Sequence, residues 1–118
     1  MQLTKIFSDG RGDINILTDL SVYPELTLFT TKKNMARGGC IHEEHDEYSC
    51  IIEGQVRYYI GDTITELGVG ESIIIKKNTP HYFLALADCL VAEWGASPSE
   101  KKNKHIEFRK IVDTINNA

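Results

Sequence analysis

Short runs of apolar and β-branched residues alternate with turn-forming residues over most of the chain, from residue 14 to about residue 95. Alternation with a period of two is typical of strands that have one buried face, and closely spaced turn signals indicate hairpins. The pattern predicts strands at 14–18, 26–31, 39–42, 48–52, 55–60, 63–67, 72–76, 81–87 and 89–94. None of these runs has the spacing of an amphipathic helix.

The turns between these runs contain residues that suit tight hairpins. Gly54, Gly61 and Gly70 can take a positive φ at no steric cost. Pro80 fixes φ directly before the run 81–87 and cannot donate to a strand ladder. With many antiparallel pairs and no helix between them, closure into a jelly-roll barrel removes exposed strand edges. We therefore expect residues 1–96 to form an all-β barrel.

The pattern changes in the last part of the chain. An irregular apolar stripe with helical spacing is formed there by Ile106, Phe108, Ile111, Val112 and Ile115. It predicts one amphipathic α-helix at about 103–115. Because 118 residues suit a single domain, we expect residues 97–118 to belong to the same domain as the barrel. The stripe can pack on the barrel or on a second subunit.

Composition and charge narrow the classes of partner. The net charge is -4 and the basic residues are scattered, which excludes the basic surface of a nucleic-acid-binding protein. No apolar run has the length of a signal peptide or of a membrane span. The three cysteines, Cys40, Cys50 and Cys89, lack CxxC spacing and favour free thiols. We expect a cytoplasmic protein with a small-molecule ligand.

The residues with the clearest chemistry lie at 37–48. Cys40 and His42 are two apart, so on a strand they face the same side. Glu47 can join them only if residues 43–46 form a turn or bulge that resets the alternation. A fourth group, His81, comes from a separate hairpin.

One thiol, two imidazoles and one carboxylate can hold a divalent metal. Zinc or iron comes ahead of nickel or manganese, because the thiolate favours softer ions. Without a metal, His42 or His81 can act as a proton acceptor. Tyr58 is a further candidate for the pocket, whereas His45 and His105 are expected at the surface.

These residues resemble the two motifs of the cupin family over about residues 34–86. His42, Glu47 and Gly54 match the end of G-x5-H-x-H-x(3,4)-E-x6-G, with Cys40 in place of the leading His. The run 70–81 resembles the second motif, with Lys-Lys-Asn in place of the usual Pro-x-Gly turn before His81. The resemblance implies a cupin-type double-stranded β-helix, a four-residue metal site in which Cys40 replaces a histidine, and a homodimer.

A second resemblance covers residues 7–94. The segment 7–12 is similar to F-x-D-x-R-G, and Arg37-Gly38 to the R-G before HxH, of cupins in nucleotide-sugar and polysaccharide biosynthesis. These include dTDP-4-keto-6-deoxysugar epimerases, 3,4-ketoisomerases and zinc-binding cupin domains of capsule enzymes. The resemblance implies a nucleotide-sugar ligand, with Arg11 or Arg37 on its phosphates. In the metal-free 3,5-epimerases the base is the His at R-G-x-H, which is Cys40 here, so a ketoisomerase-like reaction with His42 as base is favoured over epimerisation.

These residues are therefore compatible with three functions. The first is an isomerase or epimerase that acts on a nucleotide-linked keto sugar, with His42 or His81 removing a proton next to the carbonyl. The second is an iron-dependent oxygenase that uses the same ligands. The third is a binding protein without turnover. One barrel can support all three, so the side chains of the site must decide among them.

Overall fold

The computed structural model describes residues 2–19, 23–96 and 103–118. Over these ranges strands occupy most of the chain and one helix follows them, which confirms the all-β architecture with a C-terminal helix. The elements are β1 (Gln2–Asp9), β2 (Gly12–Asp19), β3 (Tyr23–Thr31), β4 (Ala36–Cys40), β5 (Glu47–Glu53), β6 (Gln55–Ile60), β7 (Thr63–Gly68), β8 (Ser72–Ile75), β9 (His81–Ala85), β10 (Cys89–Trp94) and α1 (Ile106–Asn116).

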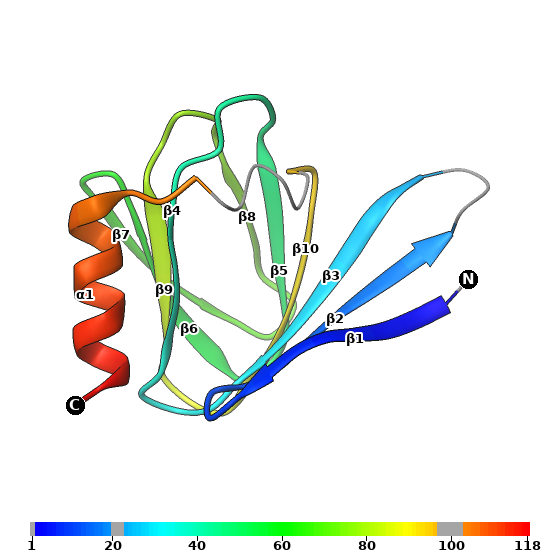
Figure 1. The fold of residues 1–118 in the computed structure, drawn as a ribbon, viewed down its shortest axis with the longest axis horizontal. Helices are drawn as coiled ribbons and strands as arrows, with labels where there is room; N and C mark the ends of the chain where they lie inside the picture. The colour runs from blue at the N-terminus through cyan, green and yellow to red at the C-terminus, as the bar shows by residue number, and fades with distance from the viewer. Residues whose placement is uncertain (1, 20–22, 97–102) are drawn as a thin grey trace.

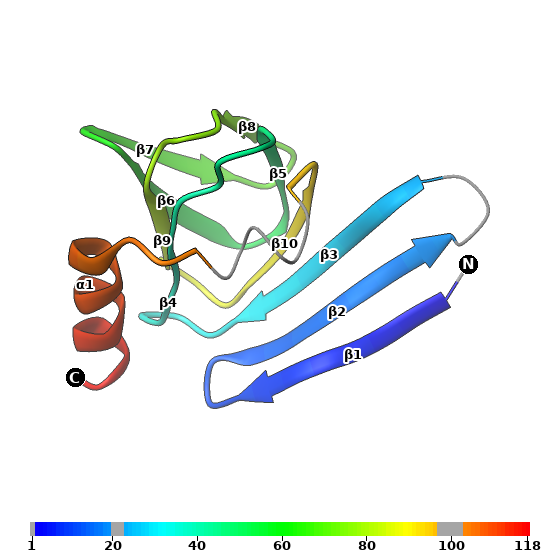
Figure 2. The same ribbon diagram turned by 45° about the horizontal axis from the view of Figure 1, so that its top comes forward.

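The strands form two antiparallel sheets that face each other (Figure 1). One has the order β1-β2-β3-β10-β5-β8 and the other the order β4-β9-β6-β7. In both views β1, β2 and the start of β3 extend away from the barrel, while α1 lies outside the smaller sheet (Figures 1 and 2). The helix contacts β4 and β9.

The main hydrophobic core lies between the two sheets. Ile51 and Val91 from the larger sheet, and Val56 and Ala85 from the smaller one, have no exposed surface. Alternate residues of β5 are buried, as the period of two predicts for a strand with one interior face. Burial of one such aliphatic side chain contributes about 1.5–3 kcal/mol, so these residues hold the sheets together.

A second cluster fixes α1 to the outside of the barrel. Val112 is fully buried against Ala36 and Tyr82, with Phe108 and Ile115 packed beside them. The other members of the predicted stripe, Ile106 and Ile111, are exposed. The buried face of the helix is therefore narrower than the sequence pattern indicates.

The start of the predicted helix is wrong by three residues, because the segment before Ile106 pairs with a strand instead. The Ile41 N–H donates to the Asn103 carbonyl at 3.0 Å, and the His105 N–H donates to the Gly39 carbonyl at 2.8 Å. His105 is the N-cap of α1, and its Nδ1 accepts a hydrogen bond from the Phe108 N–H. Residues 103–105 thus extend the edge of β4.

Two further differences concern strands. β1 was not predicted, because residues 4–10 are exposed and a bulge between Lys5 and Phe7 breaks the alternation. The strand predicted at 39–42 instead spans Ala36–Cys40 and contains a bulge between Gly38 and Cys40. His42 therefore lies in the loop that follows β4.

Candidate functional site

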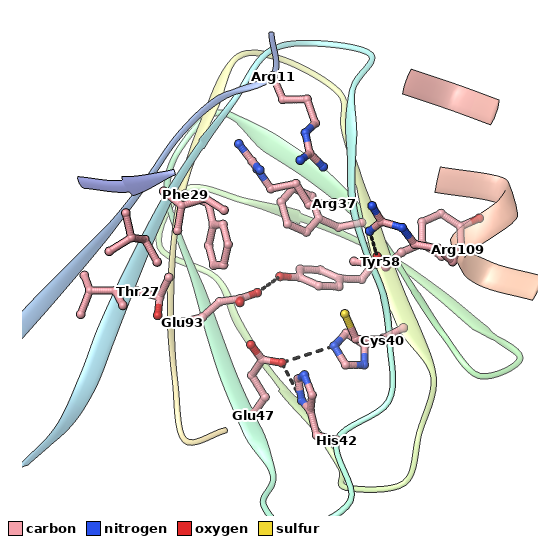
Figure 3. A pocket seen from close by; sticks show the side chains of 17 residues that line it. Arg11, Thr27, Phe29, Arg37, Cys40, His42, Glu47, Tyr58, Glu93 and Arg109 are labelled. Carbon is pink, nitrogen blue, oxygen red and sulfur yellow. Dashed lines mark hydrogen bonds and ion pairs between the residues drawn. The ribbon is translucent and has the colours of Figure 1, made fainter. Parts of the chain in front are cut away.

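A cavity of about 380 Å³ lies between the two sheets (Figure 3). It is lined by Ile6, Arg11, Ile14, Ile16, Thr27, Phe29, Arg37, Gly38, Cys40, His42, Glu47, Tyr58, His81, Tyr82, Phe83, Glu93 and Arg109. The seven residues that the sequence analysis proposed for the site are among them. The structure therefore brings these residues, which lie up to 70 positions apart in the sequence, to one interior space.

Two loops at one end of the barrel position the histidines. The Asp46 carboxylate accepts a hydrogen bond from the Lys77 N–H at 2.8 Å, and the Asn78 N–H donates to the His42 carbonyl at 2.6 Å. Asn78 has a φ of 65°, a left-handed conformation that asparagine tolerates better than most residues. The Lys-Lys-Asn turn therefore makes the bend before His81 without glycine.

His42, Glu47 and His81 converge inside the cavity. The Glu47 Oε2 atom lies 3.0 Å from His42 Nδ1 and 3.3 Å from His81 Nε2. The two imidazole rings are 4.7 Å apart, edge to face. One ligand atom from each residue lies within 4.8 Å of the others, and all three side chains are buried. Figure 3 shows both contacts to Glu47 as dashed lines.

The imidazole nitrogens that face Glu47 are suited to bind a divalent cation. His81 Nδ1 lies 3.0 Å from the Thr79 carbonyl, which can only accept, so this nitrogen carries the proton. In the neutral ring, His81 Nε2 then presents a lone pair towards the Glu47 carboxylate. Within the described ranges, the buried His42 Nδ1 has no polar partner besides the Glu47 carboxylate. Metal-binding histidines commonly donate their second N–H to a backbone carbonyl, so the residues fit a metal ion.

Cys40 lies beside this triad. It lines the cavity, and its backbone pairs with His81 in the β4–β9 ladder. Among the described residues, however, the group of close ligand atoms comprises His42, Glu47 and His81, without the Cys40 thiol. The fourth ligand expected from the sequence is thus adjacent to the other three but outside their cluster.

A second set of polar side chains, connected by hydrogen bonds, lies in the middle of the cavity. The Tyr58 hydroxyl donates to Glu93 Oε2 at 3.2 Å and lies 2.6 Å from the Ser49 hydroxyl, which must then donate to it. Burial, and next the charge of Glu93, raise the pKa of Tyr58 well above its ordinary value. Tyr58 therefore remains a neutral donor.

Glu93 is a site residue that no sequence motif predicts. The sequence signal that could have identified it is a charged residue at an inward position of β10, on the same face as the buried Cys89 and Val91. Glu93 is 6% exposed and lines the cavity, so it places a second carboxylate there.

Two arginines line the cavity away from the triad. Arg37 is 4% exposed, and its guanidinium donates to the Thr31 hydroxyl and the Thr30 carbonyl, both at 2.9 Å. Burial, and next the charge of Arg11, lower the pKa of Arg37 to about 10, so it is charged at neutral pH. Arg11 is paired with Asp9 at 2.7 Å, and this hydrogen-bonded contact lowers the pKa of Asp9.

The family model of the cupin domain matches residues 35–94, which contain His42, Glu47, Tyr58, His81 and Glu93. The chain belongs to the cupin family. The match includes both loops that position the triad, and divalent metals are common ligands of cupins. Sequence comparison with curated proteins found no match.

Solved structures share the fold over most of the chain. KdgF from Halomonas sp. superposes with a TM-score of 0.70 at 16% identity, over 79% of this chain and 84% of that one. The capsular polysaccharide assembling protein CapF from Staphylococcus aureus gives a TM-score of 0.69 at 18% identity, over 85% of this chain and 31% of that one. A variant of oxalate decarboxylase from Bacillus subtilis gives 0.69 at 17% identity, over 82% of this chain and 28% of that one. These likenesses establish the fold.

The described part of this cupin contains no helix that is long and apolar enough to cross a membrane.

Proposed function

We propose that this cupin is a metal-dependent isomerase that acts on a nucleotide-linked keto sugar. The observation that carries the proposal is the convergence of two histidines and one glutamate in a cavity that also contains buried arginine. The cavity volume of about 380 Å³ falls in the range of small-molecule sites. The similarity to CapF, whose name refers to capsular polysaccharide assembly, agrees with a sugar ligand.

Two uses of the histidines exclude each other, because a ring nitrogen that binds a metal cannot also accept a proton from a substrate. In the metal-loaded protein, His42, Glu47 and His81 would hold the ion, which would act as a Lewis acid on the substrate carbonyl. Glu93 is then the remaining carboxylate, and it accepts the proton from the carbon next to the carbonyl. Tyr58 orients it through the 3.2 Å hydrogen bond.

The isomerisation needs no external oxidant. Glu93 takes the proton from one carbon and returns it to the neighbouring former carbonyl carbon. The hydroxyl proton on the first carbon is transferred to the former carbonyl oxygen, so the carbonyl group moves by one carbon. If the site works without a metal, His42 or His81 takes the role of the base instead.

Arg11 and Arg37 bind the phosphate groups in this proposal. Guanidinium groups match phosphate oxygens geometrically and remain charged at neutral pH. Arg37 is the stronger candidate, because Asp9 already neutralises Arg11. In Figure 3 both arginines lie on one side of the Tyr58–Glu93 contact, and His42 and Glu47 lie on the other. A ligand can thus present its phosphates and its sugar to opposite ends of the cavity.

The reaction is tested with a dTDP-4-keto-6-deoxysugar in D₂O, using protein loaded with zinc or iron. Deuterium is expected at the carbon next to the carbonyl, followed by NMR, and Glu93→Gln should reduce the exchange rate at least about 100-fold. Glu53→Gln, which changes an exposed glutamate, serves as the control. Exchange by the wild type no faster than in buffer would contradict the isomerase proposal.

An iron-dependent oxygenase is the second candidate function. Two histidines and one carboxylate form the ligand set of many non-haem iron oxygenases, and this is the triad found here. Oxygen consumption by the iron-loaded protein in the presence of the keto sugar would favour this function. Turnover of the sugar under anaerobic conditions would reject it.

Cys40 is proposed as a fourth metal ligand. Its thiol shares the cavity with the triad, and a side-chain movement would be needed to bring it to the ion. Cobalt-loaded protein should then show a sulfur-to-metal absorption band that Cys40→Ser removes. An unchanged spectrum in the variant would assign Cys40 to packing alone.

We also propose that the protein is a cytoplasmic homodimer. Tyr48, Trp94 and Ile74 adjoin one another on the outer face of the larger sheet, and all three are exposed. The rings of Tyr48 and Trp94 are stacked at 5.8 Å. A contiguous apolar area of this kind favours contact with another protein surface.

A further inference from the structure

Helix α1 contributes one side chain to the cavity, although it packs on the outside of the barrel. Among the described residues of the C-terminal segment, Arg109 alone lines the cavity. Figure 3 shows its guanidinium directed from the helix towards the side of Tyr58. The helix is therefore part of the wall of the site as well as a support for β4.

The glycine pair after Arg37 makes this approach possible. Gly38 and Gly39 have φ values of 114° and 79°, and a Cβ atom on Gly39 would lie 2.8 Å from the Arg109 Cα. The absence of side chains lets the helix backbone lie directly on the strand. Arg109 then reaches across β4, and its Nη1 donates to the Gly38 carbonyl at 2.9 Å.

Arg109 keeps hydrogen-bonding capacity after these contacts. Its Nε lies 3.4 Å from Asp113 Oδ1, in a pair whose carboxylate is 55% exposed and therefore well screened. Within the described ranges, its Nη2 has no hydrogen-bond partner. Nη2 can therefore donate to a ligand in the cavity.

Arg37 is a second cationic side chain at the cavity that can bind an anion. Its donors contact a hydroxyl and a carbonyl, its guanidinium lies 5.7 Å from the Phe29 ring, and no carboxylate among the described residues forms an ion pair with it. A buried cation is costly unless an anion compensates it. Arg109 contacts the carbonyl of the residue that follows Arg37, so two cationic side chains border the same stretch of cavity wall.

We propose that Arg109 is a third anion-binding residue, which together with Arg37 holds the diphosphate group of the ligand. This inference rests on the proposed function for the nucleotide part of the ligand. The Arg-Gly-Gly sequence at 37–39 then has two tasks: it supplies one guanidinium and admits a second one from the helix. The C-terminal helix becomes a determinant of ligand affinity.

The chain offers a matched control for the structural role of α1. The Asn116 side chain accepts from the Ala36 N–H at 2.7 Å and donates to the Ala36 carbonyl at 2.9 Å. It thus fastens the helix to the same strand without lining the cavity. Asn116→Ala should loosen the helix and leave the cavity charge unchanged.

The experiment measures binding by calorimetry of the full chain, with thymidine diphosphate, inorganic pyrophosphate and thymidine as probes. Arg109→Met should lower the affinity for thymidine diphosphate and for pyrophosphate about tenfold or more, since a charge-assisted hydrogen bond is lost. Arg109→Lys should recover part of the affinity. Asn116→Ala should bind like the wild type even though its melting temperature falls.

Two results would overturn the inference: equal affinity in wild type and Arg109→Met, or equal losses in Arg109→Met and Asn116→Ala. The inference would also be overturned if the wild type bound neither thymidine diphosphate nor pyrophosphate. Binding of pyrophosphate without any contribution from the thymidine moiety would support Arg109 and reject the nucleotide part of the proposed function. Metal content, measured separately, tests the metal site independently of these outcomes.

Discussion

At Tyr58 a single hydroxyl connects two buried polar side chains. It receives a hydrogen bond from Ser49 and donates one to Glu93. All three side chains are more than nine-tenths buried, so none can replace the lost contact with bulk water. The hydroxyl therefore contributes to stability as well as to the position of Glu93.

Tyr58→Phe should lower the free energy of unfolding by about 1–3 kcal/mol, because it leaves buried polar atoms without their partner. Urea unfolding followed by circular dichroism measures the change. Tyr48→Phe is the control, since that ring is 37% exposed on the outer face, and it should change the value by less than about 0.5 kcal/mol. Equal effects of the two substitutions would contradict the assigned role.

The raised pKa of Tyr58 predicts a loss of stability at high pH. The folded protein holds the phenolic proton above the ordinary pKa of 10.0, whereas the unfolded chain releases it there. Because the unfolded state then binds fewer protons, the free energy of unfolding decreases as the pH rises above about 10. Urea unfolding between about pH 9 and about pH 11 should show a steeper decrease for wild type than for Tyr58→Phe. Parallel decreases would contradict the pKa shift.

At the scale of elements, α1 and β4 depend on each other. The fully buried Val112 packs against Ala36 of β4, and residues 103–105 pair with the edge of the same strand. β4 in turn leads into the loop that contains His42. The helix therefore supports the strand that leads to the site.

Val112→Ala should destabilise the protein by about 2 kcal/mol through lost burial and an incompletely filled cavity. Thermal unfolding measures the effect. Ile111→Ala changes the neighbouring residue, which is 40% exposed, and should cost much less. A larger effect at Ile111 than at Val112 would show that another face of the helix is buried.

The sequence predicted those elements that have a buried face and a clear turn. It predicted β2, β3, the strands from β5 to β10 and the loop before Glu47, since alternation and turn residues are local signals. It missed β1, whose residues 4–9 are exposed and therefore carry no alternation.

Site residues that depend on distant contacts were harder to predict. Arg109 reaches the cavity because Gly39 lets the helix approach, which is a relation between residues 70 positions apart. Glu93 belongs to an apolar run, and only its inward direction on β10 indicates a role. Local motifs predicted the three residues of the triad, because two loops with motif residues meet there.

At the scale of the whole molecule, the outer face of the larger sheet predicts association. Sedimentation equilibrium should give twice the chain mass of 13.3 kDa at micromolar concentration. Ile74→Lys should produce monomers, because a charge would be buried without a partner at the centre of the contact. Ile64→Lys, at a 62% exposed position on the other sheet, should leave the dimer intact. A monomeric wild type would reject this surface as the dimer contact.

The central claim is that His42, Glu47 and His81 form a metal site, and metal content tests it most directly. Protein prepared without a metal-binding tag is loaded with zinc or iron, passed through gel filtration and analysed by mass spectrometry. The wild type should retain about one ion per chain. Glu47→Gln and His81→Gln should retain far less, while His45→Ala, at an exposed position next to the site, should match the wild type. No retained metal in the wild type, or equal metal in all four proteins, would contradict the account.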